Sequence, residues 1–403
     1  YPDDVRVRCE AESLVRAGHQ VCVIAPGGPA QACRETVAGV RVVRYRLPRT
    51  PPTPVGFVLE YLIATLQLHV RGAAELLRGA SILHLHNPPD SLFLLAAFAR
   101  ALRRQVVYDQ HDLVPELLRV KFGESWLVAL LELMERATYR LASLVIAPNA
   151  SHRAVAIRRG RVPASRVTVV RNGPPAHWLA RSANGRPGTL RDPHLVFLGS
   201  MESQDGVDAL PDLLRELAER HDLPNARLTM IGDGSRREAI GRALAIGGAI
   251  DRVTFTGQLE HDEVLRLLKR ADICVDPAER NELNDRSTMV KIAEYMAAGK
   301  PIVAHRLTET EFTAAQAALY SPSNDAAGLA TQVARLARDP ELRAELGRVG
   351  LERAQALTWE RSEEALLDAY RRLSCRRPRR SARPAAGMPT SARSGPIPCR
   401  CKR

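Results

Sequence analysis

The sequence predicts an α/β protein built from two doubly wound domains, each a parallel sheet covered by helices. Short apolar segments of strand length alternate with helical segments along most of the chain, which is typical of βαβ units. The 403 residues suffice for two to three domains of roughly 150 residues each. The share of hydrophobic residues, 45%, indicates a globular protein with a substantial core.

In the first half of the chain, helical patterns and apolar runs follow one another closely. Helices are predicted at residues 5–17, 55–78, 91–102 and 125–141, and strands at 21–25, 40–44, 82–85, 106–109 and 144–147. A doubly wound domain normally opens with a strand, yet Tyr1 lies directly before a helix. We therefore expect the first, central strand of this domain to be missing from the sequence given.

The second half repeats the alternation and ends in a segment of different composition. Strands are predicted at 194–198, 226–231, 253–256, 273–275 and 302–304, with helices between them. The junction near 171–193 is rich in turn-forming residues, among them Asn172, Gly173, Pro174, Pro175, Gly185, Pro187 and Gly188. We predict the following units: a first domain at 1–175, a second at 190–357, a helix at 358–374 that crosses back to the first domain, and a disordered basic tail at 375–403.

The sequence predicts neither a membrane span nor secretion. The most apolar run, residues 54–70, is interrupted by Glu60, and the N-terminus lacks the basic-then-apolar pattern of a signal peptide. The seven cysteines are scattered and odd in number, which fits free thiols in a reducing cytosol better than a disulfide framework. We therefore expect a cytoplasmic protein.

The net charge of +13 is unevenly distributed along the chain. Residues 1–180 carry 23 Lys and Arg against 14 Asp and Glu, residues 181–374 carry 26 against 31, and residues 375–403 carry nine basic residues and no acidic one. A basic first half suits anionic partners such as phosphates or anionic lipid headgroups. Nucleic-acid binding is an alternative that rests on the tail alone, because the first half lacks a basic stripe interleaved with aromatic residues. We expect no specific nucleic-acid partner.

Residues 275–304 carry the pattern most indicative of a ligand site. A strand leads through the loop AERNELNDRST into the helical segment MVKIAEYMAAG. The helix is expected to begin near Ser287 or Thr288, where free backbone N–H groups and the helix dipole favour phosphate, with Lys291 about one turn on. Glu294 lies seven residues after Ser287 and would accept hydrogen bonds from sugar hydroxyls near the same face. The pattern suits a nucleotide, although an ordinary capped helix has the same spacing.

Several motifs, taken together in their order, resemble those of the family 4 glycosyltransferases, also called group 1 glycosyltransferases. They are RVRCEAESLVRAGH, HNPPD, YDQHDLVPEL, VVRNG, VFLGSMESQDGVD, TMIGDGSRRE, VTFTGQLEHDEV, ADICVDP and NDRSTMVKIAEYMAAGKPIVA. The resemblance covers roughly residues 1–374 and implies the GT-B fold, in which two Rossmann-like domains face each other across a cleft. It also implies a hexosyltransferase-type enzyme that moves a sugar from a nucleotide-sugar donor, held by the second domain, to a hydroxyl acceptor held by the first.

The resemblance assigns candidate residues to the donor side and to catalysis. The donor-binding candidates are Gly199, Ser200, Gln258, Leu259, Arg286, Ser287, Thr288, Lys291 and Glu294. His111 and Lys291 are the candidate catalytic residues. His111 matches a histidine that lies beside the donor sugar in similar enzymes, and Asp109 and Asp112 are placed to orient it.

His86, Asn87 and Asp112 are the candidates for the acceptor side. His84 alternates with His86 and points the same way, but a buried structural histidine fits that position equally well. Neither a metal nor another cofactor is expected, because similar enzymes usually need none. The sequence agrees, since it shows neither an Asp-x-Asp pair nor a cluster of His and Cys ligands.

Two departures from the family pattern keep a second hypothesis open. Glu294 matches the second glutamate of the family's Glu-x7-Glu motif, but Arg286 stands in place of the first. The loop 199–206 also lacks the basic residues that relatives often place against the diphosphate. We expect Arg286 or Lys291 to supply that charge, since a charge-assisted hydrogen bond contributes roughly 1.5–3 kcal/mol. The alternative is a degenerate glycosyltransferase that binds a nucleotide or a partner enzyme without catalysis.

The resemblance further implies a role in building cell-surface polysaccharides or glycolipids. Similar bacterial enzymes act on lipid-linked or saccharide acceptors, and many retain the anomeric configuration. We expect attack from the side of the leaving group, with the leaving phosphate taking the acceptor proton, because no carboxylate is well placed as a nucleophile. The basic first half fits attachment to the anionic inner face of the cell membrane.

Overall fold

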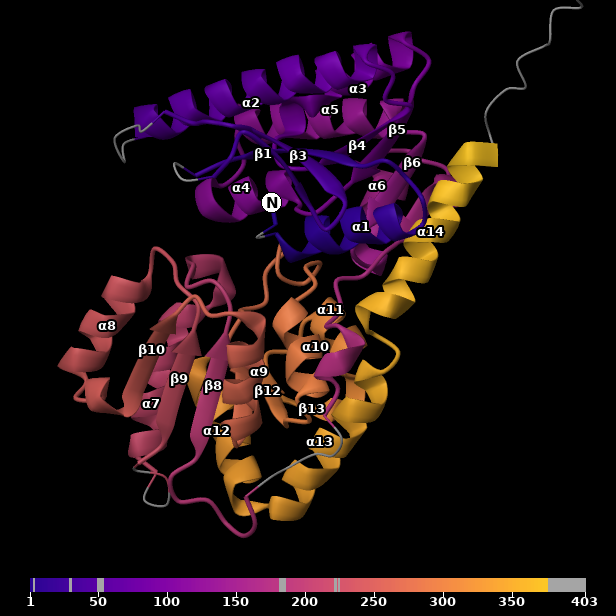
Figure 1. Ribbon diagram of the computed structural model, residues 1–403. Helices are drawn as coiled ribbons and strands as arrows, with labels where there is room; N and C mark the ends of the chain where they lie inside the picture. Colours follow the sequence, from indigo (N-terminus) through magenta and orange to yellow (C-terminus); the bar gives the residue numbers. More distant parts are fainter. Residues whose placement is uncertain are drawn as a thin grey trace, which may run out of the picture.

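The computed structural model describes residues 1–375 except residues 3, 29–30, 49–53, 181–185, 221–222 and 224. Two α/β domains face each other, and the long C-terminal helix runs along the first of them (Figure 1). This arrangement confirms the predicted α/β class with two Rossmann-like domains. Gly185 and the predicted tail beyond Cys375 lie outside the described residues.

The second domain is built on one six-stranded parallel sheet with β8 and β11 at its centre. The strands lie in the order β10-β9-β8-β11-β12-β13. Their bounds are β8 (His194–Leu198), β9 (Arg227–Ile231), β10 (Val253–Gly257), β11 (Ile273–Asp276), β12 (Ile302–Ala304) and β13 (Ala318–Tyr320). The helices are α7 (Leu210–Ala218), α8 (Arg237–Ile246), α9 (His261–Arg270), α10 (Val290–Ala297), α11 (Thr308–Ala314), α12 (Ala326–Arg338) and α13 (Pro340–Ala354).

Helices cover both faces of this sheet because its central strands are apolar on both sides. All four residues of β11 and all three of β12 are buried. Two separate hydrophobic clusters form the core, one that includes Phe197 and α7 and one that includes Val196 and α10. Since neighbouring residues of a strand point to opposite faces, Val196 and Phe197 place these clusters on the two sides of the sheet.

The first domain contains two smaller sheets. One is parallel in the order β4-β5-β6-β7, and in the other β3 pairs with β1 in parallel and with β2 in antiparallel fashion. The strands are β1 (Cys22–Pro26), β2 (Arg34–Val37), β3 (Val40–Tyr45), β4 (Ile82–His86), β5 (Gln105–Asp109), β6 (Leu144–Ala147) and β7 (Val167–Val169). The helices are α1 (Val5–Arg16), α2 (Pro54–Leu77), α3 (Phe93–Ala101), α4 (Val114–Phe122), α5 (Trp126–Leu141) and α6 (Ala150–Arg158).

Among the described residues, β1 and β4 each have one hydrogen-bonded neighbour, so each leaves one edge open. The expected additional strand therefore stays a prediction. The predicted strands and helices occur within about one to three residues of the positions read from the sequence. The sequence did not predict β2, β7, β13, α4 and α6, nor the three helices α11, α12 and α13 that follow β12. β7 and β13 have only three residues each, and β2 is a largely exposed edge strand without an apolar run.

The chain crosses between the domains twice, and the two crossings run side by side. α14 (Trp359–Cys375) packs on α1 and β7 of the first domain. The backbone N–H of Trp359 donates to the carbonyl of Pro174 at 3.0 Å. A Cβ atom at Gly173 would lie 1.8 Å from the carbonyl oxygen of Leu357, so only glycine permits this close approach.

A buried ion pair joins α1 to the end of β5. Arg6 donates through Nε and Nη2 to the two carboxylate oxygens of Asp109, at 2.9 and 2.7 Å. Its Nη1 donates to the carbonyl of Val170 at 2.9 Å and to Oδ1 of Asn172 at 2.6 Å. Nη2 also lies 3.3 Å from the buried carboxylate of Glu10. One guanidinium therefore connects the first helix, the first sheet and the segment that leaves the domain.

We predict that Arg6→Ala lowers the free energy of unfolding by about 3–5 kcal/mol, because Asp109 and Glu10 would remain buried without a counter-charge. Urea denaturation followed by circular dichroism measures the change. Arg16→Ala is the matched control, since Arg16 lies on the same helix and forms an exposed ion pair with Glu363 at 2.6 Å. The control should lose less than about 1 kcal/mol. Equal losses in the two variants would contradict the role given to Arg6.

Candidate functional site

Lys291 lies at the point where the strand order of the second sheet reverses. β8 and β11 are neighbours at the centre of the sheet, and the chain runs outward from them in opposite directions. Open α/β sheets bind ligands at the carboxyl ends of such a pair of strands. Lys291 is the second residue of α10, and its Nζ lies 3.3 Å from Asp205, which follows β8, and 3.4 Å from Asp276, which ends β11.

Gly199 leaves the space that the lysine side chain occupies. A Cβ atom at Gly199 would lie 3.0 Å from Cε and 3.2 Å from Nζ of Lys291, and the φ of Gly199 is +144°. The lysine ammonium also lies 4.7 Å from the centre of the Phe197 ring. A Cβ atom at Gly232 would lie 2.1 Å from the carbonyl oxygen of Gly199, so the turns after β8 and β9 pack backbone against backbone. The structure thus brings together two of the predicted donor-side residues, Gly199 and Lys291.

The two aspartates change the electrostatics that the sequence suggested for Lys291. Burial by itself lowers the pKa of Lys291, but Asp276 and Asp205 outweigh this effect and raise the pKa. The ammonium therefore stays charged, and its charge is already balanced inside the protein. A diphosphate bound here would either share the ammonium with Asp205 or take the place of the Asp205 carboxylate beside it. The sequence holds no local signal for this pairing, because Asp205 lies 86 residues before Lys291.

The prediction that the helix begins near Ser287 or Thr288 is wrong by two to three residues. α10 begins at Val290, with Met289 in the N-cap position and without a side-chain cap. The preceding loop folds into successive turns, in which the N–H of Ser287 donates to the carbonyl of Asn284 at 3.2 Å. The hydroxyl of Ser287 donates to the carbonyl of Leu283 at 2.8 Å. These groups of Ser287 are therefore used within the loop, and the free N–H groups of the helix begin after it.

Glu294 lies three residues after Lys291, so the two side chains share one face of α10. The helical spacing inferred between Ser287 and Glu294 does not hold, because Ser287 lies before the helix. Among the described residues the side-chain carboxyl group of Glu294 has no hydrogen-bond or ion-pair partner. Burial raises the pKa of Glu294 to about 7, with Lys291 opposing the shift. Glu294 is thus a partly buried carboxyl group with unused acceptor capacity beside the lysine.

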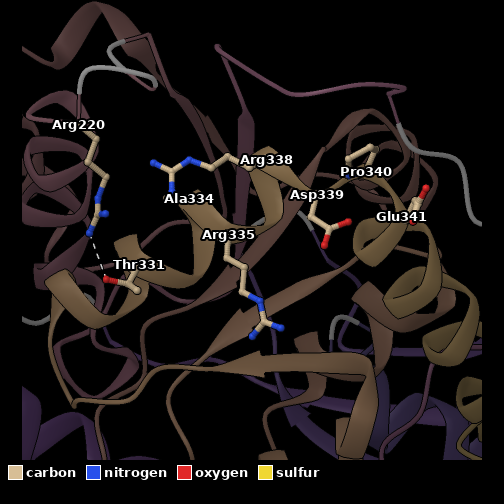
Figure 2. Close-up of a pocket in the computed structure, with 8 residues that line it drawn as sticks. All are labelled: Arg220, Thr331, Ala334, Arg335, Arg338, Asp339, Pro340 and Glu341. Carbon is tan, nitrogen blue, oxygen red and sulfur yellow. Dashed lines mark hydrogen bonds between the residues drawn. The ribbon is translucent and has the colours of Figure 1, made fainter.

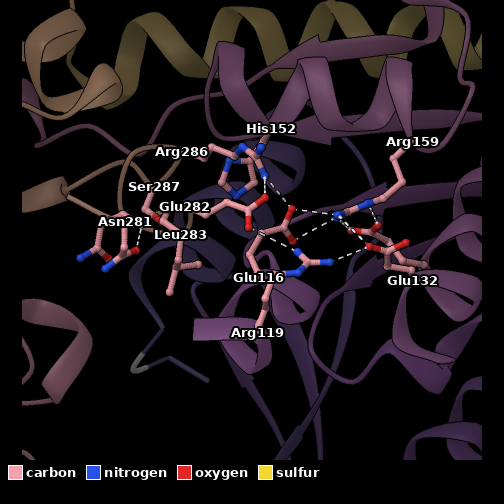
Figure 3. A network of polar contacts seen from close by, with 12 residues as sticks. Glu116, Arg119, Glu132, His152, Arg159, Asn281, Glu282, Leu283, Arg286 and Ser287 are labelled. Carbon is pink, nitrogen blue, oxygen red and sulfur yellow. Dashed lines mark hydrogen bonds and ion pairs between the residues drawn. The ribbon is translucent and has the colours of Figure 1, made fainter. Parts of the chain in front are cut away.

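Arg286 points toward the first domain instead of toward the loop after β8. Its Nη1 lies 2.9 Å from Glu116 on α4 and 2.9 Å from Glu282 (Figure 3). Glu116 is fully buried and also binds Arg159 at 2.8 Å. The expectation that Arg286 supplies charge to the diphosphate is therefore not met in this arrangement, in which its guanidinium forms an ion pair between the domains.

Asn149 ties the same loop to the first domain. Its Nδ2 donates to the carbonyl of Arg286 and to Oγ1 of Thr288, both at 2.8 Å. Its Oδ1 accepts a hydrogen bond from the N–H of His152 at 2.7 Å and so caps α6. Sequence reasoning missed Asn149 and Glu116 as partners of this loop. The signal for Asn149 was its place as a helix-capping residue directly after β6.

In the first domain, the candidates His86, Asn87 and His111 lie together where β4 and β5 end. Asn87 is buried, and its Oδ1 accepts a hydrogen bond from the N–H of His111 at 2.7 Å. Its Nδ2 donates to the carbonyl of Asp112 at 2.8 Å. Nδ1 of His86 lies 2.8 Å from Nε2 of His111. Asn87 therefore positions the loop that carries His111.

Asp109 orients His111, but Asp112 does not. Nε2 of His111 lies 3.0 Å from Oδ2 of Asp109. Burial alone would raise the pKa of Asp109, yet Arg6 and the hydrogen bonds from His111 and His86 hold it well below its usual range. Asp112 is exposed and takes part through its backbone carbonyl. The expectation that both aspartates orient His111 is corrected to Asp109 alone.

The fold also assembles a group of possible metal ligands that the sequence did not reveal. Glu10, His84, His86 and Asp109 each offer a ligand atom, and these atoms lie within 4.8 Å of one another. His84 stacks on His86 at 4.4 Å between ring centres, and its Nδ1 lies 2.7 Å from the hydroxyl of Tyr370 on α14.

Arg6 already provides a positive charge at this group, since it contacts both Asp109 and Glu10. Burial lowers the pKa of His84 and of His86, so both rings are neutral near pH 7. The arrangement fits a network of buried polar side chains that holds His111 in place.

The remaining donor-side candidates have few contacts. Ser200 and Gln258 are exposed, and neither forms a hydrogen bond with another described residue. Leu259 is half-buried and packs against the core of the second domain. A surface depression of about 520 Å³ lies elsewhere, between α7, α12 and α13 (Figure 2). Arg338 ends α12 there, and helices of this domain end near the amino ends of the strands, so the depression lies on the opposite side of the sheet from Lys291.

Two family models match the chain, one in each domain. "Glycosyl transferase 4-like domain" matches residues 4–173, and "Glycosyl transferases group 1" matches residues 192–339. Among curated proteins, a glycogen synthase of Mycobacterium tuberculosis is 27% identical over 54% of this chain and 51% of its own length. The chain spans about half the length of the curated relatives it matches first.

Solved structures with the same fold cover nearly the whole chain. The sucrose-phosphate synthase from Thermosynechococcus elongatus has a TM-score of 0.74 at 22% identity, over 92% of this chain and 93% of that chain. Anabaena HepE in complex with UDP has a TM-score of 0.66 at 16% identity, over 92% and 97% of the two chains. Together with the two family matches, this similarity shows that the chain belongs to the group 1 glycosyltransferases, glycosyltransferase family 4, and has the GT-B fold.

Proposed function

We propose that the protein transfers a hexosyl group from a nucleotide-sugar donor to a hydroxyl acceptor. The observation that carries this proposal is the shared helix face of Lys291 and Glu294 at the reversal point of the second sheet. A diphosphate placed there would meet the ammonium and the start of α10, and a ribose would meet the unused carboxyl group of Glu294. HepE, a structural neighbour, binds UDP, so uridine nucleotides are the first donors to test.

The chemistry needs stabilisation of negative charge on the departing nucleoside diphosphate. Lys291 and the N-terminus of α10 would provide it, since they form stronger interactions with the leaving group as its charge grows. His111, held by Asp109 and Asn87, is the candidate for contact with the donor sugar. In this proposal the protein's own cations carry the charge at the diphosphate, and a metal ion is not required. We place the reaction among retaining transfers, with the acceptor attacking from the side of the leaving group.

The proposed acceptors are lipid-linked sugars or saccharides of cell-surface polysaccharide or glycolipid synthesis, used at the inner face of the membrane. None of the described helices is both long and apolar enough to cross a bilayer. The basic residues of the first domain would favour an anionic surface.

A second candidate function is nucleotide or partner binding without catalysis. Two observations favour it. Lys291 is neutralised by Asp205 and Asp276, and Arg286 is engaged between the domains. Release of UDP from a panel of UDP-sugars, with and without lipid-linked acceptors, separates the two functions. Calorimetric binding of UDP without any turnover across the panel would favour the binding protein.

We predict that Lys291→Met lowers kcat by about 100-fold, because stabilisation of the leaving group is lost. Arg286→Ala should lower kcat by about fivefold or less, since it removes a half-exposed ion pair between the domains. Steady-state kinetics of both variants test the order of these effects.

The Lys291 variant leaves two aspartates without their cation, so its stability needs a separate check. The double variant Lys291→Met with Asp205→Asn keeps the charge sum of the cluster and should be equally inactive but better folded. Lys269→Ala, an exposed lysine on α9, is the matched control with normal kcat. If Arg286→Ala loses more turnover than Lys291→Met, the two roles are reversed.

We predict that the affinity for UDP rises with pH through the pKa of Glu294, which is about 7. The ionised carboxylate accepts hydrogen bonds from both ribose hydroxyls, whereas the protonated acid keeps one oxygen as a donor. Between about pH 6 and about pH 8 the ionised fraction increases roughly tenfold, and the affinity should increase by up to that factor. Calorimetry across this range measures it.

Glu294→Gln is the control, because it keeps the shape of the side chain and cannot ionise. Its affinity should be about five- to 150-fold weaker than that of the parent protein, which corresponds to roughly 1–3 kcal/mol. The titration of the diphosphate itself remains in both proteins and cancels in the comparison. An unchanged affinity and pH profile in Glu294→Gln would remove Glu294 from the donor site.

A further inference from the structure

The long helix α2 exposes a continuous apolar line to its surroundings. Leu59, Leu62, Leu66, Val70 and Leu77 are exposed by 49, 58, 63, 59 and 68%. Their spacings of three, four, four and seven residues place them on one side of the helix. A surface helix of a globular protein normally carries polar side chains on that side. Figure 1 shows α2 as the outermost helix of the first domain.

The neighbouring helices continue this surface. α2 packs on α3, α3 on α5, and α5 on α4. Phe98 on α3 and Leu133 on α5 are 36 and 60% exposed, while Phe122 and Trp126, at the turn between α4 and α5, are 76 and 77% exposed. Of the eighteen exposed large apolar side chains in the described part of the chain, fourteen lie between residues 59 and 133. We call this surface the apolar face of α2–α5.

Arginines lie next to the apolar face, at the C-terminal ends of α5 and α6. Together with Gly160 they line a depression of about 240 Å³. The arginines are Arg136, Arg140, Arg158, Arg159 and Arg161. Arg136 and Arg159 pair with glutamates. Arg140, Arg158 and Arg161 are exposed and form no ion pair with any described residue. Following α5 along its outer side, apolar residues such as Leu133 give way to arginines.

α4 connects the apolar face to the acceptor side of the candidate site. It begins at Val114, two residues after Asp112, and ends at the exposed Phe122. Its nine residues span only about 13 Å. The same helix carries Glu116, which contacts the donor-side loop through Arg286. A molecule anchored at the apolar face could therefore reach the acceptor side over a short distance.

We propose that the apolar face of α2–α5 docks on a lipid bilayer that contains anionic headgroups. The leucines and aromatic rings would insert at the boundary of the acyl chains, while Arg140, Arg158 and Arg161 bind lipid phosphates. Stable attachment of this kind needs both signals, and the face supplies both. The proposal rests on the proposed function, because transfer to a lipid-linked acceptor brings the enzyme to a bilayer.

A second copy of this chain fits the face less well. A two-fold axis brings the same patch of two copies together, so the arginines at one end of the face would lie against the other end of the partner's patch, where the apolar side chains offer no counter-charge. Anionic headgroups complement the apolar surface and the arginines at once. The charge of the arginines therefore favours a bilayer as the occupant.

Co-sedimentation of the full chain with phospholipid vesicles tests this proposal. We expect about tenfold stronger binding to an equimolar mixture of phosphatidylglycerol and phosphatidylcholine than to phosphatidylcholine alone. The double variant Leu62→Gln with Leu66→Gln should bind the mixed vesicles about tenfold more weakly. Arg140→Ala with Arg158→Ala should lose the preference for the anionic lipid. Both leucines and both arginines are exposed, so these variants should fold normally.

Ile246→Gln is the matched control, since Ile246 is 89% exposed on α8 of the second domain. It should bind vesicles like the parent protein. Equal binding of the leucine variant and the parent protein, or no preference for phosphatidylglycerol, would overturn the proposal. The proposal would also be overturned if light scattering showed a dimer of the parent protein and a monomer of the leucine variant. The apolar face would then be the interface with a second copy of the chain.

Calorimetry with UDP in the absence of vesicles keeps the two proposals apart. Vesicle binding without UDP affinity would contradict the donor site alone. UDP affinity with no vesicle binding would contradict the docking surface alone. The leucine and arginine variants should keep the UDP affinity of the parent protein, because these residues lie outside the site.

Discussion

The first domain is organised around one buried ion pair, that of Arg6 with Asp109. The guanidinium lies on α1 and the carboxylate ends β5, and the same guanidinium binds Val170 and Asn172 where the chain leaves the domain. A buried charge without a partner is strongly unfavourable, so these parts must assemble together. The position of His111 depends on the same pair, because its imidazole ring is hydrogen-bonded to the carboxylate of Asp109.

The second domain obeys the same constraint at Lys291, where one ammonium lies between two aspartates. A diphosphate at this point would exchange one anionic partner of the ammonium for another, so the lysine itself would lose little hydration on binding. The unfavourable contribution to the free energy of binding comes from Asp205. Its carboxylate would lose the lysine and would need water or a proton in its place. Burial already raises the pKa of Asp205, which makes proton uptake the easier response. We therefore expect donor binding to depend on the protonation of the Asp205 carboxyl group in the loop after β8.

The sequence predicted the central strands and the lysine because both have local signals. β8, β11 and β12 are uninterrupted apolar runs, and Lys291 lies in a recognisable motif. The missed contacts have no local signal, since Glu116 and Arg286 lie 170 residues apart and meet only when the domains face each other. α6 was missed for a related reason, because its helix buries His152 and has no continuous apolar side to give a helical pattern.

Arg286 illustrates how a change in a motif can alter the contact between two domains. Glu116 is fully buried and is already paired with Arg159, so it would not be left without a cation if Arg286 moved away. Arg286 itself is 36% exposed and would regain water on separation. When both partners of an ion pair can be stabilised without each other, the pair contributes little to holding the domains together. Loss of this contact would therefore leave no buried charge unpaired, and the Asp109 and Lys291 clusters, each inside one domain, do not depend on it.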